Sequence, residues 1–89
     1  MNNKTITIIN KLGLHARAAA KFVQVASGFH AEINVHSAHR EVSGKSIMGI
    51  MMLAAGKGAE VEIKTIGPDE DEAMAAIEAL INNKFGEDE

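Results

Sequence analysis

The chain has 89 residues, of which 46% are hydrophobic and 24% are charged, so we expect one globular domain spanning residues 1–89. It contains no cysteine, which excludes a disulfide framework, a cysteine metal site and thiol catalysis. The longest apolar run, Ile47 to Ala55, is too short to span a bilayer, and no signal peptide is recognisable at the N-terminus. These features predict a cytoplasmic protein that is not inserted in a membrane.

The net charge of −3 is distributed unevenly along the chain. Residues 69–89 carry a net charge of −7, whereas residues 1–68 carry +4. A mildly basic body with an acidic C-terminal segment favours an acidic partner surface over nucleic acid. The three aromatic side chains are phenylalanines that form no base-stacking series with basic neighbours, which also argues against a nucleic-acid partner.

The first half of the chain alternates between strand and helix patterns. Residues 5–8 alternate between polar and apolar side chains and predict a strand. Residues 16–27 place apolar side chains at the spacing of one helix face. Residues 32–36 alternate again, and residues 40–43 follow after a short turn, so these two strands are expected to form a hairpin.

The second half continues with a helix, a strand and a helix. A short helix is expected over residues 47–53, with Ser46 as its N-cap. Residues 60–64 alternate and predict a fourth strand. The last helix is expected to begin at Pro68-Asp69, because Asp69 and Glu72 have the spacing of a capping box.

The predicted order is therefore β-α-β-β-α-β-α. Every predicted strand is half polar, which is typical of a sheet with one buried and one solvated face. All three helices should then pack on the same side of the sheet, giving a two-layer α+β domain. Because the exposed sheet face would be polar, we expect a monomer.

The segment Gly13-Leu14-His15-Ala16-Arg17 lies where a loop meets the first helix, and His15 is the expected N-cap. The first backbone N–H groups of a helix have no internal partner and favour an anion. If the ring of His15 accepts a phosphoryl group, the N–H groups of Ala16 and Arg17 can receive the phosphate oxygens, and the Arg17 side chain adds a mobile charge. Position alone leaves open a second interpretation, in which His15 only caps the helix.

A second candidate region surrounds Ser46. A phosphoserine at a helix N-cap is compatible with the helix dipole and places a dianion on the surface. A short helix buries only one stripe, so Ile47, Met48 and Met51 are expected to be partly exposed and to form an adaptable contact patch. The alternative that all three belong to the core remains open at this point.

No metal or cofactor is expected. The remaining histidines flank a strand and its turn, and a metal site would need a third ligand. No second general base accompanies His15, so a carrier or a binding module is favoured over a stand-alone enzyme.

Together these residues resemble the HPr family, the histidine-containing phosphocarriers of the bacterial sugar phosphotransferase system. The active-site segment of that family has the form G-[LM]-H-A-R-P-A, and residues 13–19 of this chain read Gly-Leu-His-Ala-Arg-Ala-Ala. The regulatory-serine segment of the family is matched by Lys45-Ser46-Ile47-Met48-Gly49. The resemblance covers essentially the whole chain and implies an open-faced β-sandwich with a four-stranded antiparallel sheet and three helices on one face.

The resemblance also implies a function. His15 would take a phosphoryl group on Nδ1 from phosphorylated enzyme I, whose donor is phosphoenolpyruvate, and pass it to a histidine of an EIIA domain. Arg17 would assist the transfer, and Ser46 would be the site of the ATP-dependent HPr kinase/phosphorylase. Ile47, Met48 and Met51 would form part of the partner surface, to which we add Ala18.

Two features depart from a simple match. The family usually has proline after the arginine, whereas this chain has Ala18, which keeps the helix and adds one N–H group. The segments 10–13, 67–70 and 85–88 look like the nitrogen-related paralogue NPr, while the segment around Ser46 looks like a kinase-regulated HPr. The sequence therefore leaves open the sugar branch, the nitrogen branch, and a binding module controlled by Ser46.

Overall fold

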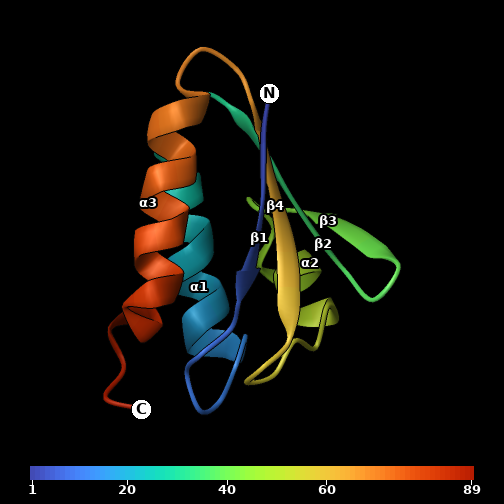
Figure 1. Ribbon diagram of the computed structural model, residues 1–89, viewed down its shortest axis with the longest axis vertical. Coiled ribbons are helices and arrows are strands. Elements are labelled where there is room, and N and C mark those ends of the chain that lie inside the picture. The colour runs from blue at the N-terminus through green and yellow to red at the C-terminus, as the bar shows by residue number, and fades with distance from the viewer.

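The computed structural model describes all residues 1–89 and has the predicted order of elements (Figure 1). The strands and helices are β1 (Asn2–Thr7), α1 (Ala16–Ala26), β2 (Glu32–Ser37), β3 (Arg40–Ser43), α2 (Ile47–Met52), β4 (Glu60–Ile66) and α3 (Glu70–Asn82), followed by a short 3₁₀ helix, η1 (Lys84–Gly86). The structure contains no helix with the length and apolar character needed to cross a membrane.

The four strands form one antiparallel sheet in the order β1-β4-β2-β3. The predicted hairpin between β2 and β3 is confirmed, with Val35 opposite Val42. In the central strand β4, Val61 and Ile63 are buried against the helices, whereas alternate residues on the other face reach solvent. The predicted sheet with one buried and one open face is therefore confirmed.

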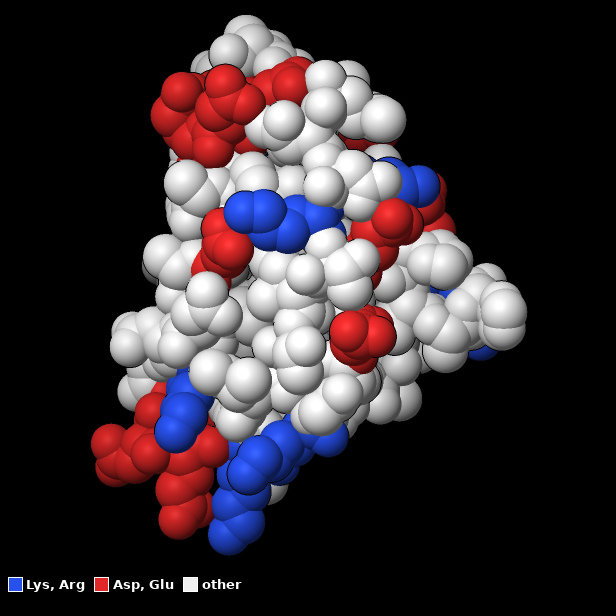
Figure 2. All heavy atoms as spheres, viewed as in Figure 1, with Lys and Arg blue, Asp and Glu red and all other residues white.

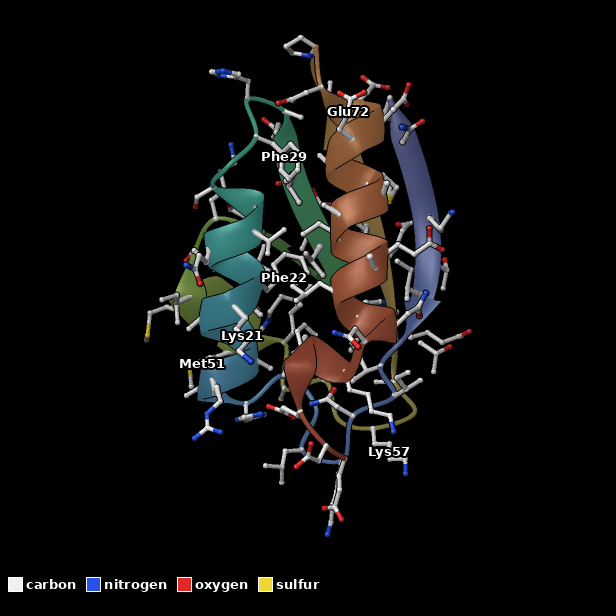
Figure 3. The ribbon with its side chains drawn as sticks, turned by 90° about the vertical axis from the view of Figure 1, so that its left-hand side faces the viewer. Lys21, Phe22, Phe29, Met51, Lys57 and Glu72 are labelled. Atoms are coloured by element: carbon white, nitrogen blue, oxygen red, sulfur yellow. The ribbon has the colours of Figure 1, made fainter.

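The three helices cover the buried face of the sheet. Figure 1 shows α1 and α3 side by side on one side of the strands. Phe22 of α1 points into the space between these helices and the sheet (Figure 3), where it is fully buried with Ile77 of α3. Small residues such as Ala19 and Ala73 are also fully buried and allow the helices to approach closely. The fold is the open-faced α+β sandwich that the sequence predicted.

The predicted capping box at the start of α3 is wrong. Asp69 occupies the N-cap position, but its carboxylate makes no hydrogen bond within its own helix. It accepts instead from the backbone N–H groups of His30 and Ala31, at 2.8 and 2.7 Å. The hydrogen bond from His30, followed by the bond from Ala31, lowers the pKa of Asp69 in spite of partial desolvation. The side chain that caps the turn is that of Glu70, which accepts from the N–H of Gly67 at 3.1 Å.

The turn η1 was not predicted, and it sets the position of the C-terminal segment in the fold. The side chain of Phe85 is buried, and its backbone has a left-handed φ of 56°. The Nζ of Lys21 donates a hydrogen bond to the carbonyl oxygen of Phe85 at 2.6 Å, which ties η1 to α1. The chain then returns towards the beginning of α1, so the C-terminus and the loop before α1 lie at the same end of the molecule (Figure 1).

Candidate functional site at the beginning of α1

The loop before α1 is held in place by backbone contacts. Gly13 has a φ of +67°, and a Cβ atom at this position would lie 2.5 Å from the carbonyl oxygen of Ala55. Leu14 is buried, and its N–H donates to the same oxygen at 2.9 Å. Only glycine fits this close approach without strain. The loop therefore presents His15 from a fixed backbone.

His15 is the N-cap of α1, as predicted, with extended backbone angles of −72° and 178°. Its side chain makes no capping hydrogen bond, and the N–H groups of Ala16 and Arg17 donate to no protein acceptor. The Arg17 side chain is exposed and forms no ion pair. The beginning of α1 thus offers free N–H groups, the positive end of the helix dipole and a movable guanidinium to an anion.

Ala18 is fully buried, which corrects its prediction as a partner-binding residue. It lies on the inner side of the first turn of α1, where its methyl group packs in the core. A side chain without exposed area cannot contact another protein. Its influence on the site is limited to the backbone of the first turn.

The C-terminal tail, residues 87–89, folds over this site and was not anticipated there. The carboxylate of Glu87 contacts the Nε2 of His15 through Oε2 and accepts a hydrogen bond from Asn10 Nδ2 through Oε1, at 2.9 Å. Further along the tail, Lys11 is tied to Glu89 by a backbone hydrogen bond of 2.5 Å and an ion pair of 3.4 Å. Part of the acidic C-terminal segment therefore lies against His15 and Lys11 of the same chain.

The pKa of Glu87 is lowered by these contacts. Desolvation is the largest single influence and would raise it, but the hydrogen bonds from Asn10 and His15 and the charges of His15 and Arg17 together outweigh that influence. Glu87 is therefore held as a carboxylate.

The residues around His15 line one open hollow, in which basic and acidic side chains are interleaved. Figure 2 shows acidic and basic groups side by side at the end of the molecule where the chain terminates. The lining residues are Lys11, Leu12, His15, Ala16, Arg17, Lys21, Gly86, Glu87, Asp88 and Glu89. An open hollow of this kind suits a group that is received from one protein and delivered to another. No group of three or more His, Cys, Asp or Glu side chains is arranged to hold a metal ion.

The region around Ser46 has the geometry that was predicted. Ser46 is the N-cap of α2, and its Oγ accepts from the N–H of Gly49 at 3.0 Å. Ile47, Met48 and Met51 are exposed by 44%, 70% and 41%, so the alternative that they belong to the core is wrong. Figure 3 shows Met51 on the outer side of the helix layer, away from α3.

The comparison with known proteins identifies the family. A family model described as the PTS HPr component phosphorylation site matches residues 2–83. The chain belongs to the HPr family. A phosphocarrier protein HPr from Cupriavidus necator is 56% identical over 89 residues and covers 100% of both chains. HPr relatives of this similarity establish the resemblance noted in the sequence.

Solved HPr structures share the fold as well as the sequence. HPr-C-His from Thermoanaerobacter tengcongensis superposes with a TM-score of 0.96 at 49% identity and covers 100% of both chains. A crystal structure described as an HPr dimer from the same organism has a TM-score of 0.79 at 50% identity, covering 98% of this chain and 100% of that one. The chain is thus a phosphocarrier of the phosphotransferase system by family, a carrier rather than a catalyst.

Proposed function

We propose that this protein accepts a phosphoryl group on Nδ1 of His15 from phosphorylated enzyme I and passes it to a histidine of an EIIA domain. Phosphoenolpyruvate would be the original donor. The observation that carries the proposal is the position of His15 at the N-cap of an α-helix whose first N–H groups are free. These groups and the unpaired Arg17 are available to the oxygens of a phosphoryl group.

Phosphoryl transfer requires only a nucleophilic nitrogen and charge stabilisation from this chain. The Nδ1 lone pair forms a bond to phosphorus while the bond from phosphorus to the donor nitrogen breaks, and the donor recovers its electron pair. Positioning and charge stabilisation dominate such transfers. An open site with one mobile guanidinium holds the group without enclosing it, which allows its onward transfer to the EIIA domain.

The decisive experiment is the intact mass after incubation with enzyme I and phosphoenolpyruvate, followed by mild acid. We expect the gain of one phosphoryl group that acid removes, as phosphohistidine requires. His15→Ala should gain none, whereas His36→Ala, a change on β2, should behave as wild type. Full phosphorylation of the His15→Ala protein would refute the assignment.

We further propose that Ser46 is a regulatory phosphorylation site for an HPr kinase/phosphorylase. The supporting observation is that Ser46 caps α2 directly beside the exposed apolar side chains of Ile47 and Met48. A negative charge there should weaken binding to enzyme I, because an apolar interface would bury it. Ser46→Asp should therefore bind enzyme I more weakly in calorimetry, and Thr5→Asp on the open sheet face is the matched control. Equal affinities would remove the regulatory proposal.

The remaining features of the proposed function are the location, the oligomeric state and the branch that the protein serves. We propose a cytoplasmic monomer that requires no cofactor, serving the sugar branch or the nitrogen branch. The polar sheet face favours the monomer, although one HPr relative is described as a dimer. Sedimentation velocity at micromolar concentration distinguishes the two states, and incubation with purified EIIA domains of each branch identifies the acceptor.

A further inference from the structure

A continuous series of hydrogen bonds runs from the backbone of the loop to the ring of His15. Asn10 is fully buried, and its Nδ2 donates both to the carbonyl oxygen of Gly13 at 2.8 Å and to Glu87 Oε1 at 2.9 Å. The second carboxylate oxygen, Oε2, contacts Nε2 of His15. The Oδ1 atom of Asn10 has no hydrogen-bond partner.

The chemistry of each partner fixes the direction of every bond in this series. A backbone carbonyl can only accept, so the atom of Asn10 that faces Gly13 must be the amide nitrogen. The same nitrogen faces Glu87, whose carboxylate can also only accept. Rotating the amide of Asn10 would place Oδ1 against both the carbonyl of Gly13 and the carboxylate. The orientation of Asn10 is therefore locked, although it leaves Oδ1 without a partner.

The locked carboxylate in turn decides which nitrogen of His15 carries the proton. Because Glu87 accepts at Oε2, the Nε2 of a neutral ring must be the N–H donor. The remaining nitrogen, Nδ1, then holds the lone pair, and it makes no hydrogen bond to the protein.

We propose that Glu87 is a positioning residue that holds His15 in its Nε2–H tautomer and thereby makes Nδ1 the phosphoryl acceptor. The effect of this tautomer on phosphoryl transfer rests on the proposed function. During transfer Nδ1 forms the bond to phosphorus, the donor phosphohistidine loses that bond and recovers its electron pair, and the proton on Nε2 does not move. The ring becomes positively charged, and the adjacent carboxylate of Glu87 balances that charge.

The neighbouring charges do not provide an alternative partner for Nε2. Lys11, Arg17 and Lys21 line the hollow and can only donate, so none can accept the proton of Nε2. Asp88 makes no hydrogen bond or ion pair, and Glu89 is paired with Lys11. Glu87 is the acidic side chain whose contact with the ring is present in the structure.

The test is the tautomer of His15, read from the ¹⁵N shifts of its ring in NMR at a pH where the ring is neutral. The wild-type protein should show the Nε2–H form. Glu87→Gln should invert it, because the amide oxygen must face Asn10 and the amide NH₂ group then faces Nε2, which has to accept. Glu87→Ala should give a mixture of both forms. Glu89→Gln makes the same charge change on the tail without touching the ring and should match wild type.

A second measurement connects the tautomer to transfer. The rate of phosphoryl acceptance from enzyme I should fall in the order wild type, Glu87→Ala, Glu87→Gln, with the last about 10–100-fold slower than wild type, because it lacks the charge-assisted hydrogen bond to the ring. A purely structural role for Glu87 would make the alanine variant at least as slow as the glutamine variant, and would leave the tautomer unchanged.

The outcomes separate the two proposals. An Nδ1–H form in the wild-type protein, or an unchanged tautomer in Glu87→Gln, overturns the role of Glu87 even if phosphorylation proceeds. If the wild-type protein accepts no phosphoryl group, the proposed function fails, while the NMR result still decides the tautomer. The wild-type spectrum alone can overturn the inference, so it does not depend on the folding of any variant.

Discussion

The close approach of Gly13 to the loop at residues 55 and 56 offers the sharpest test of how the site is built. In Gly13→Ala the new Cβ would lie 2.5 Å from the oxygen of Ala55 and 2.6 Å from the Cα of Gly56. Both contacts are with backbone, so neither can be relieved by turning a side chain. The residue would also have to keep a φ of +67°.

The two costs can be estimated separately. A left-handed backbone costs an alanine about 1–2 kcal/mol, and forcing a methyl group into an occupied space costs about 1–3 kcal/mol more. Gly13→Ala should therefore lower the free energy of unfolding by about 2–5 kcal/mol. Two other glycines provide controls. Gly58 has a φ of +90° with nothing within 4 Å of its Cβ position, and Gly56 has the same open space without a positive φ.

Urea unfolding of the three variants at one pH measures their free energies of unfolding. Gly58→Ala should lose about 1–2 kcal/mol through its backbone alone, and Gly56→Ala should stay within about 0.5 kcal/mol of wild type or gain slightly. Equal stabilities for Gly13→Ala and Gly58→Ala would refute the reasoning, because the close approach would then contribute nothing. If the reasoning holds, Gly13→Ala should also slow phosphoryl acceptance by displacing His15.

Three further predictions concern other parts of the molecule. The pKa of Asp69 is lowered chiefly by the N–H of His30, so its carboxylate stabilises the fold above its ordinary pKa of 3.8 and loses that contribution as the pH falls through the folded value. Asp69→Asn should unfold at lower urea than wild type at pH 7, with the difference shrinking at acidic pH; a constant difference would contradict this linkage. Phe85→Ala empties a buried position and should cost about 3–5 kcal/mol in the same assay, and a loss below about 1 kcal/mol would show that η1 is not anchored by its ring. Met48→Ala should change stability by less than about 0.5 kcal/mol because the side chain is 70% exposed. Calorimetry should detect weaker binding of this variant to enzyme I. Unchanged binding would exclude Met48 from the interface.

The parts of the fold that depend on local pattern could be predicted from the sequence. Alternation along residues 60–64 determines which side chains of β4 face the core, and the apolar spacing around Phe22 does the same for α1. The N-cap positions of His15 and Ser46 follow from where those helices begin. These features involve residues within one turn or one strand, so periodicity and capping preferences are sufficient to find them.

The features that were missed depend on contacts between distant parts of the chain. Glu87 reaches the ring of His15 only because Phe85 is buried in a left-handed turn that reverses the chain. No periodicity marks that turn, and an acidic tail is more often solvated. Asp69 was assigned to its own helix because the capping-box spacing is local, whereas its actual donors belong to the segment before β2. Both contacts therefore join segments that are far apart in the sequence, and local pattern does not reveal them.

The order of the strands has a consequence for how the chain reaches this structure. Strand β4 lies in the middle of the sheet and pairs with β1 on one side and β2 on the other. Even the pair between β1 and β4 that is nearest in sequence, Thr7 with Glu60, encloses most of the chain. Contacts between such distant residues slow folding, because a long loop must close before they form. During synthesis, β1 and the β2–β3 hairpin therefore cannot join into one sheet before β4 emerges from the ribosome.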